Sequence, residues 1–398
     1  MIQEILLSLA NNIGPLAVLC DTMTEKPRII SAVISDLVTD QRVHRAALSL
    51  HEAGYPVLLV GRQRKASLPL DQRPYAVRRF RLWWEKGPLF YAAFNLRLFL
   101  FLLTKKADIL LANDLDTLPA VWLAAFIKGS KVVYDSHELF CEVPELTHRP
   151  RTRNIWKRIE RFLLPKLRNA YTVNESIASI YRKEYGVDFK VVRNVPLRLP
   201  AQAIPALTRA DLQWPGDRRV LVFQGTGINV DRGAEEAIRA MEFLDDFLLV
   251  FVGGGDVYEQ LRLEVSSKGL SDRVIFLPRQ RPETLRAITR LADVGLSLDK
   301  DTNLNYRYSL PNKLFDYIQA GIPVIATSIP EVQRIVEQYR VGGIVSDLRP
   351  EVLAGFIRDT FSDPGRIRTW KENAQLAADE LNWDQEKTRL LDIIEHAR

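Results

Sequence analysis

Apolar and polar positions divide the first half of this chain into short strands and longer helices. Continuous apolar runs cover residues 29–34, 57–60, 107–112 and 131–134, and an amphipathic helical pattern covers residues 40–53. Short apolar runs separated by helices are typical of a parallel sheet that carries helices on both faces. The pattern therefore predicts an α/β domain in the first half.

A second series of strands and helices begins after a proline-rich joint at residues 196–205. Its predicted strands cover residues 220–223, 247–252, 274–276, 294–298 and 323–326. A chain of 398 residues is also longer than one average domain. We therefore predict two Rossmann-like parallel α/β domains that face each other across a cleft, over residues 1–200 and 201–383.

Polar residues follow two of the predicted strands in the first half. Asn113 and Asp114 follow one strand, and the segment 135–138, which includes His137 and Glu138, follows the next. Ligands of parallel α/β sheets bind beyond the carboxyl ends of the strands. We therefore expect these side chains to point into one crevice, although a histidine at this place can also serve only to close a local turn.

A glycine loop follows the first strand of the second half. Gly225 and Gly227 come directly after that strand, and Arg232 with Gly233 precedes the next helix. Glycines let the backbone approach an anion, and a helix N-terminus beside an arginine attracts phosphate. This loop is therefore a candidate phosphate site, whereas the three glycines at 253–255 predict a turn.

The stretch 309–325 is a second candidate anion site. Ser309 is a candidate helix cap, Asn312 and Lys313 fall in the first turn, and Asp316 lies one turn further along the same face. A cation at a helix start suits a diphosphate, and a carboxylate suits a ribose diol. A surface Lys–Asp pair on an ordinary α/β helix would give the same pattern.

Charge and cysteine content narrow the class of partner. The formal net charge of +6 favours anionic partners. A nucleic-acid-binding protein is the alternative that this charge raises, but the basic residues are scattered and form no stripes with aromatics, so we expect no nucleic-acid partner. Cys20 and Cys141 are too few for a disulfide framework, and the first twenty residues lack the basic start of a secretory signal. We expect a cytoplasmic protein.

The segment 83–106 suggests contact with a membrane surface. Its apolar part, 88–103, is shorter than the roughly 20 residues of a membrane span and is interrupted by Asn95 and Arg97. Aromatic and basic residues flank it, which is typical of an interfacial helix. A buried core helix would show the same composition. An interfacial helix would place the protein at the inner face of the plasma membrane.

With these motifs in this order, the second half resembles the donor-binding domain of family 4 glycosyltransferases, which have the two-domain GT-B fold. The resemblance rests on the loop 225–233, the glycines 253–255, and Asp316 followed by residues 320–326. The first half is similar more loosely, through residues 54–57, 135–138 and 191–196. Asn382 and Trp383 resemble the point where the last helix of this fold returns to the N-terminal domain, which here would be residues 384–398.

The resemblance implies a role for each candidate residue. His137 would hydrogen-bond the transferring sugar, while Arg232 and Lys313 would stabilise charge on the leaving diphosphate. The residues that would bind the donor are Gly225, Gly227, Arg232, Ser309, Asn312, Lys313 and Asp316. The acceptor side would be formed by Asn113, Asp114 and Glu138.

The chain departs from the family pattern at three places. Gly227 stands where the family usually has an arginine, and Arg232 replaces a lysine. Tyr308 and Asp316 stand where the family has two glutamates, so the first carboxylate is missing. Lys313 would then supply the cation that is absent at Gly227. The missing carboxylate leaves a non-catalytic nucleotide-sugar-binding protein as an alternative.

The resemblance implies a retaining glycosyltransferase that moves a sugar from a UDP- or GDP-sugar to a glycan or lipid-linked acceptor, as in assembly of a bacterial surface polysaccharide. A nucleotide-sugar epimerase of the same fold is the nearest alternative. Asp114 and Asp116 have the Asp-x-Asp spacing that can hold a hard cation. Because the second half already offers cations for a diphosphate, we expect no required metal and no other cofactor.

Overall fold

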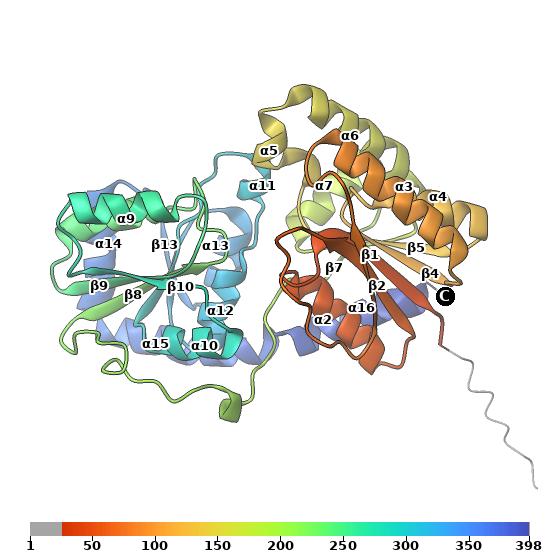
Figure 1. The fold of residues 1–398 in the computed structure, drawn as a ribbon. Helices are drawn as coiled ribbons and strands as arrows, with labels where there is room; N and C mark the ends of the chain where they lie inside the picture. The colour runs from red at the N-terminus through yellow and green to blue at the C-terminus, as the bar shows by residue number, and fades with distance from the viewer. Residues whose placement is uncertain (1–25, 398) are drawn as a thin grey trace, which may run out of the picture.

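The computed structural model describes residues 26–397, which form two lobes that each enclose a parallel sheet (Figure 1). The first sheet has the strand order β3-β2-β1-β4-β5-β6-β7, and the second has the order β10-β9-β8-β11-β12-β13. The prediction of two Rossmann-like α/β domains is therefore confirmed. Cys20 and the first twenty residues, for which we expect no secretory signal, lie outside the described part of the chain.

The strands of the first sheet are β1 (Ile29–Asp36), β2 (Val57–Gln63), β3 (Ala76–Arg81), β4 (Ile109–Asn113), β5 (Lys131–Ser136), β6 (Asn169–Thr172) and β7 (Lys190–Val191). The strands of the second sheet are β8 (Arg219–Gly225), β9 (Phe247–Gly253), β10 (Val274–Pro278), β11 (Val294–Ser297), β12 (Val324–Thr327) and β13 (Gly342–Val345). Each predicted strand is present within a few residues of its expected bounds.

Four strands escape the hydrophobic pattern, and each has a physical reason. β3 carries three arginines among its six residues and lies at an edge of the sheet. β6 has four residues and β7 has two, so neither is long enough to show the hydrophobic pattern of a strand. β13 begins with two glycines, which are poor strand formers.

The helices of the N-terminal lobe are α2 (Gln41–Glu52), α3 (Pro88–Thr104), α4 (Leu118–Lys128), α5 (Pro144–Thr147), α6 (Pro150–Leu163) and α7 (Glu175–Tyr185). Those that follow β8 are α8 (Ala234–Ala240), α9 (Tyr258–Ser267), α10 (Pro282–Arg290), α11 (Leu304–Arg307), α12 (Asn312–Ala320), α13 (Pro330–Tyr339), α14 (Pro350–Ser362), α15 (Pro364–Glu380) and α16 (Trp383–His396).

The last helix, α16, returns to the N-terminal lobe and lies beside α2 (Figure 1). The indole N–H of Trp383 donates to the hydroxyl of Ser49 at 2.8 Å, and its backbone N–H donates to the carbonyl of Pro196 at 3.0 Å. Trp383 thus joins α16 to α2 through its buried ring and to the segment that connects the two sheets through its backbone. These contacts attach the last helix to the N-terminal lobe.

Helix α3 has one buried and one exposed side. Phe90, Phe94, Leu98 and Leu102 are buried and pack in the core of the lobe. Leu96 and Leu100 on the other side are exposed, as is Trp83 before the helix. The buried side agrees with the alternative of a core helix, while the interfacial helix stays a prediction. Among residues 26–397, no helix is long and apolar enough to cross a membrane.

Candidate functional site

A cavity of about 710 Å³ lies between the two lobes, at the carboxyl ends of the central strands of both sheets. Its N-terminal wall comes from the start of α2 and the end of β5, and its C-terminal wall from the loop after β8 and the start of α12. The size is within the range of about 300–1,000 Å³ that small-ligand sites occupy. The cavity is therefore a candidate site for a substrate that contacts both lobes.

The structure brings eight of the eleven predicted site residues to the lining of this cavity. They are His137, Glu138, Gly225, Gly227, Arg232, Ser309, Asn312 and Lys313. The other three, Asn113, Asp114 and Asp316, lie behind the lining and contact residues that form it or the strands beneath. Residues far apart in sequence thus meet where the carboxyl-end rule for parallel sheets expects them.

Two of the predicted cations share one buried carboxylate. The guanidinium of Arg232 lies 2.7 Å from one oxygen of Asp299, and the ammonium of Lys313 lies 3.0 Å from the other. Asp299 is fully buried, whereas Arg232 remains partly exposed toward the cavity. The three side chains carry a net charge of +1 at the cavity wall. This excess positive charge is suited to an anionic ligand.

The pKa directions agree with a charged cluster. Burial alone would raise the pKa of Asp299, but Lys313 and Arg232 outweigh it and lower the pKa. Burial lowers the pKa of Lys313, and Asp299 opposes that shift. Burial would likewise lower the pKa of Arg232, but Asp299 raises it. The Nε of Arg232 is buried and has no hydrogen-bond partner among the described residues.

The start of α12 differs from the prediction in its cap. Pro311 occupies the N-cap position, and no side chain closes the helix there. The hydroxyl of Ser309 instead donates to the carbonyl of Tyr306 at 2.9 Å, so Ser309 ends the preceding turn and does not cap α12. The exposed Asn312 and the first free N–H groups of α12 consequently face the cavity without a side-chain partner.

Asp316 lies one turn after Lys313, but it does not line the cavity and contacts a residue of the lining from behind. Its carboxylate accepts a hydrogen bond from the amide of Gln224 at 3.2 Å, and Gln224 itself lines the cavity. Burial raises the pKa of Asp316, while the Arg286 guanidinium opposes the rise. Gln224 also accepts from the hydroxyl of Thr289 at 2.7 Å, which fixes the orientation of its amide. Asp316 therefore orients a cavity residue in this structure.

The glycine loops after β8 and β9 hold each other in place. The N–H of Gly254 donates to the carbonyl of Gly225 at 3.2 Å, and the N–H of Ile228 donates to the carbonyl of Gly254 at 2.9 Å. A Cβ on Gly253, which has a φ of +142°, would lie 1.8 Å from the Gly225 carbonyl oxygen. Position 253 therefore has no space for a side chain, whereas a Cβ on Gly225 or Gly227 would meet no atom closer than 3.5 Å.

The imidazole of His137 is held between two carboxylates at the end of β5. Its Nδ1 lies 3.0 Å from Asp114, and its Nε2 lies 3.3 Å from Asp135. Asp135 also forms an ion pair with Arg42 from the first turn of α2. The backbone N–H of His137 donates to Asp114 at 3.0 Å. His137 is therefore an oriented side chain at the cavity wall, and both Asp114 and Asp135 position it.

Asn113 and Asp114 occupy a different place from the one expected. The amide of Asn113 donates to the hydroxyl of Ser31 and to the carbonyl of Ala32, both at 2.9 Å, and so joins β4 to β1. Asp114 follows with a φ of +63° and turns its carboxylate toward His137. Neither residue lines the cavity, because each is used to hold the strand ends together.

In the Asp-x-Asp pair, Asp116 is buried and Asp114 is partly buried, and neither residue lines the cavity. Burial raises the pKa of Asp116 to about 8, so this carboxyl group is largely protonated at neutral pH. Burial also raises the pKa of Asp114. Among residues 26–397, no group of three or more His, Cys, Asp or Glu side chains has an arrangement that could hold a metal ion.

Glu138 links the two lobes across the cavity. Its carboxylate accepts a hydrogen bond from the amide of Asn305 at 2.9 Å, and the Asn305 oxygen accepts from the N–H of Leu139 at 3.2 Å. The carbonyl of Tyr308 accepts from the amide of Asn174 at 2.8 Å. Tyr308, which stands where the family pattern has a glutamate, thus contributes its backbone to the contact between the lobes.

Several cavity residues were not among the sequence candidates. Asp299 follows β11, so the strand-end rule that selected His137 would also have found it. No sequence motif marks the other three, which are Arg42, Arg45 and Asn305. Each lies in a helix, and only the tertiary structure brings it to the cavity. Arg45 donates to Asn194 of the connecting segment, and burial lowers its pKa to about 10.

Two parallel α/β domains with a polar, cationic cavity between them define a protein of the GT-B class. The model of the family "Glycosyltransferase Family 4" matches residues 40–196, and the model "Glycosyl transferases group 1" matches residues 206–377. The chain therefore belongs to the GT-B glycosyltransferases related to family 4, as the motif resemblance predicted.

Individual relatives agree with this assignment. The lipopolysaccharide core biosynthesis glycosyltransferase LpsD of Rhizobium meliloti is 37% identical over 89 residues, which are 22% of this chain and 25% of that protein. The matched curated relatives are aligned over only 20% to 44% of their own lengths. Activity and substrates therefore do not transfer from any one of them.

Solved structures share the whole fold. Sucrose-phosphate synthase from Thermosynechococcus elongatus superposes with a TM-score of 0.75 at 19% identity, over 93% of this chain and 99% of that one. The Anabaena protein HepE in complex with UDP-glucose superposes with a TM-score of 0.70 at 16% identity, over 93% of this chain and 100% of that one. At such identities the likeness establishes the fold alone.

Proposed function

We propose that this protein is a retaining glycosyltransferase that moves a sugar from a nucleotide diphosphate sugar to a glycan or lipid-linked acceptor. The observation that carries the proposal is the Arg232–Asp299–Lys313 cluster in the cavity between the lobes. Two cations on one carboxylate leave positive charge beside the free N–H groups of α12, which is what a diphosphate requires.

In this proposal the donor lies along the C-terminal wall. The diphosphate contacts Arg232, Lys313 and the start of α12, and the sugar projects toward His137 on the opposite wall. The loop with Gly225 and Gly227 has room for close approach of the phosphate. The UDP-glucose that HepE binds in its structure supports a UDP-sugar as one candidate donor.

Catalysis would rest on positioning and on stabilisation of the leaving group. As the bond between sugar and diphosphate breaks, negative charge grows on the diphosphate, and Arg232 and Lys313 stabilise it. The departing diphosphate accepts the proton of the attacking acceptor hydroxyl on the same face of the sugar, which retains the anomeric configuration. These two side chains supply the positive charge that a metal ion would otherwise provide, so we propose that no metal or other cofactor is required.

We further propose that the acceptor is lipid-linked and that the N-terminal lobe contacts a membrane surface. Helices α3, α4 and α6 lie together on one side of that lobe (Figure 1). We define their exposed apolar residues, together with the preceding Trp83, as the apolar face: Trp83, Leu96, Leu100, Phe126, Ile127 and Phe162. Lys105, Lys128 and Lys166 lie among or beside them and suit anionic head groups.

This arrangement would place transfer at the inner face of the plasma membrane, in assembly of a bacterial surface polysaccharide. The match to LpsD, a lipopolysaccharide core glycosyltransferase, supports that setting. The acceptor would then approach from the side of His137 and Glu138, the wall that belongs to the lobe with the apolar face.

A thermal-shift screen against UDP-, GDP-, ADP- and TDP-sugars tests the proposal. We expect one nucleotide family to stabilise the protein, and the best donor to be consumed only when a glycan or lipid-linked acceptor is added. The product anomer, assigned by NMR, should match that of the donor. Conversion of the donor without acceptor would indicate an epimerase, and binding without any conversion would indicate a non-catalytic binding protein.

A further inference from the structure

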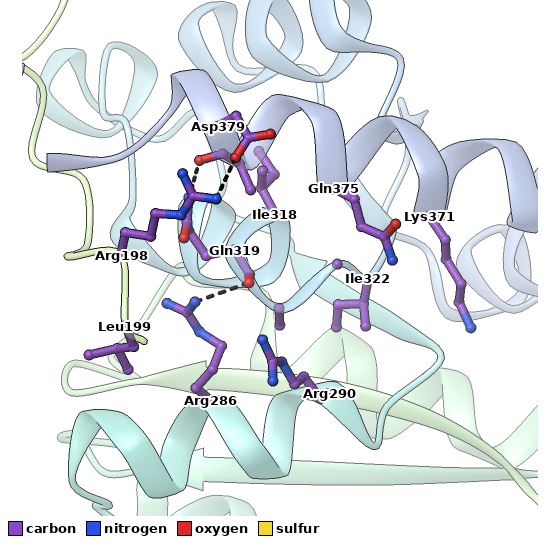
Figure 2. A pocket seen from close by; sticks show the side chains of 13 residues that line it. Arg198, Leu199, Arg286, Arg290, Ile318, Gln319, Ile322, Lys371, Gln375 and Asp379 are labelled. Carbon is purple, nitrogen blue, oxygen red and sulfur yellow. Dashed lines mark hydrogen bonds and ion pairs between the residues drawn. The ribbon is translucent and has the colours of Figure 1, made fainter. Parts of the chain in front are cut away.

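A second cavity, of about 510 Å³, lies in the C-terminal lobe between α10 and α15 (Figure 2). These two helices cover the opposite face of the second sheet from α9 (Figure 1). Its walls come from α10, from the last turn of α12, from α15, and from the segment that connects the two sheets. None of its lining residues lines the cavity between the lobes. It is therefore a separate site.

Four cations line this second cavity, and only one carboxylate does. The cations are Arg198, Arg286, Arg290 and Lys371, and the carboxylate is Asp379. Arg198 pairs with Asp379 at 2.9 Å, while Lys371 lies 3.9 Å from Asp293 just outside the lining. Arg290 has no hydrogen-bonded or ionic partner among the described residues. The lining consequently has an excess of positive charge.

Arg286 and Arg290 lie one turn apart on α10 and point the same way (Figure 2). Like charges at this spacing destabilise a helix by roughly 0.2–0.5 kcal/mol. Arg286 is 6% exposed, and its guanidinium donates to the carbonyl of Gln319 at 3.0 Å. That contact with the end of α12 explains Arg286, and Lys371 has only the long contact with Asp293, so Arg290 is the lining cation without a hydrogen-bonded or ionic partner among the described residues.

The rest of the lining would suit the body of a small ligand. Leu199, Ile318 and Ile322 provide apolar surface between the cations (Figure 2). The amide of Gln319 donates to the carbonyls of Ala378 at 2.6 Å and Leu381 at 3.2 Å, so the walls formed by α12 and α15 are fixed to each other. Pre-formed walls with a few convergent charged groups are typical of ligand sites.

We propose that this cavity binds a phosphorylated small molecule, with Arg290 and Lys371 as its main phosphate contacts. A bound phosphate would bring together Arg198 of the connecting segment and the helices α10 and α15 of the lobe. It would also contact the end of α12, whose first turn carries Lys313. Since α12 has nine residues, the two sites lie about 13 Å apart along one helix.

We propose that this second cavity is a regulatory site. Ligand binding there does not depend on the proposed function, but its effect on glycosyl transfer does. Arg286 lies between the two sites, because its charge acts on Asp316 in the layer behind the cleft and its side chain lines the second cavity. Ligand binding at the second cavity would alter the position of α12 and of the connecting segment, and through them the cleft.

Calorimetric titration with inorganic pyrophosphate separates the two sites. We expect the wild type to bind two equivalents, because the cleft can also take this probe. The double variant Arg290→Ala/Lys371→Ala should keep one site and lose the other, with at least a tenfold weaker affinity at the second cavity. The control Arg262→Ala/Lys268→Ala removes the same charge from the opposite face of the lobe, at α9, and should keep both sites.

Arg232→Gln should remove the cleft site and keep the second one, and Asn312→Asp serves the same purpose if Arg232→Gln folds poorly. In either background, pyrophosphate should protect residues 196–201 and 318–322 from hydrogen exchange. A single site that disappears with Arg232→Gln, or full binding by Arg290→Ala/Lys371→Ala, would overturn the second site. If the wild type binds pyrophosphate at the second cavity but not in the cleft, the result would instead count against the proposed function.

Discussion

The Lys313 ammonium lies 3.0 Å from the Asp299 carboxylate, and both side chains are buried at the wall of the cleft. Lys313 is held by this carboxylate and lines the cavity in which we propose that the diphosphate lies. Because Arg232 occupies the other oxygen of Asp299, one carboxylate orients both cations. In the proposed function, the geometry of this cluster sets where the leaving group is stabilised.

Lys313→Ala should weaken binding of the donor and of its nucleoside diphosphate. A hydrogen bond to a charged group contributes about 1.5–3 kcal/mol, which corresponds to roughly 10- to 100-fold in Kd. Calorimetry with the best nucleotide measures this. Lys300→Met is the matched control, since Lys300 pairs with Glu236 at 2.6 Å and does not line the cavity. Unchanged donor binding by Lys313→Ala would remove Lys313 from the site.

His137→Gln should lower turnover and leave nucleoside diphosphate affinity unchanged. His137 lies on the wall opposite the cation cluster, where the sugar would be, so its loss affects the reacting end of the donor. We expect kcat to fall about tenfold to a hundredfold, as for loss of an oriented hydrogen bond to a developing charge. The exposed His148 gives the control His148→Gln. A larger effect on nucleotide Kd than on kcat would mean that His137 binds the nucleotide and not the transferring sugar.

Gly253→Ala should destabilise the protein and disturb the loop after β8. The new Cβ would lie 1.8 Å from the Gly225 carbonyl oxygen, at a φ of +142° that alanine rarely adopts. We expect a loss of about 1–3 kcal/mol in the free energy of unfolding, measured by urea denaturation. Gly355→Ala in α14 meets no atom within 4 Å and should keep or raise stability. Equal stability of the two variants would contradict the packing described for the loops.

Asp116→Asn should make stability less sensitive to pH. Burial raises the pKa of Asp116 from 3.8 to about 8, so the folded state holds a proton that the unfolded state releases. Its contribution to stability is full below about pH 4 and is lost as the pH rises toward 8. Urea unfolding at pH 6 and pH 8 should show a smaller loss for Asp116→Asn than for the wild type. The exposed Asp71 supplies the control Asp71→Asn, and equal slopes for all three proteins would refute the assignment.

Replacing Trp83, Leu96, Leu100 and Phe126 with serine should reduce partitioning onto vesicles that contain anionic lipid. These side chains are 91%, 60%, 54% and 73% exposed, so their removal takes little from the core. Vesicle sedimentation should show at least a tenfold drop. Leu263 and Leu376, which are similarly exposed on the other lobe, give the control for lost apolar surface. The same partitioning before and after replacement would disprove membrane contact through the apolar face.

Hydrophobic periodicity and motif order were enough to predict both sheets and most of the cleft. Gly225, Arg232 and Lys313 could be selected because helix starts and glycine loops have local sequence signatures. Asp299 also follows a strand, but a single aspartate at a strand end is common, and only its contacts with Arg232 and Lys313 distinguish it. Tertiary contacts also decided the details that differ from the prediction. The hydroxyl of Ser309 donates to the Tyr306 carbonyl and accepts no hydrogen bond from the N–H groups of α12, and Asn113 joins two strands instead of facing an acceptor.

The most direct test of the account is a calorimetric comparison of nucleoside diphosphate with the matching nucleoside monophosphate, in the wild type and in Arg232→Gln. If the cleft binds a diphosphate through the cation cluster, the wild type will bind the diphosphate at least tenfold more tightly, and Arg232→Gln will lose most of that difference. Equal affinity of the wild type for the two nucleotides, or no binding of any nucleoside diphosphate, would contradict the central claim.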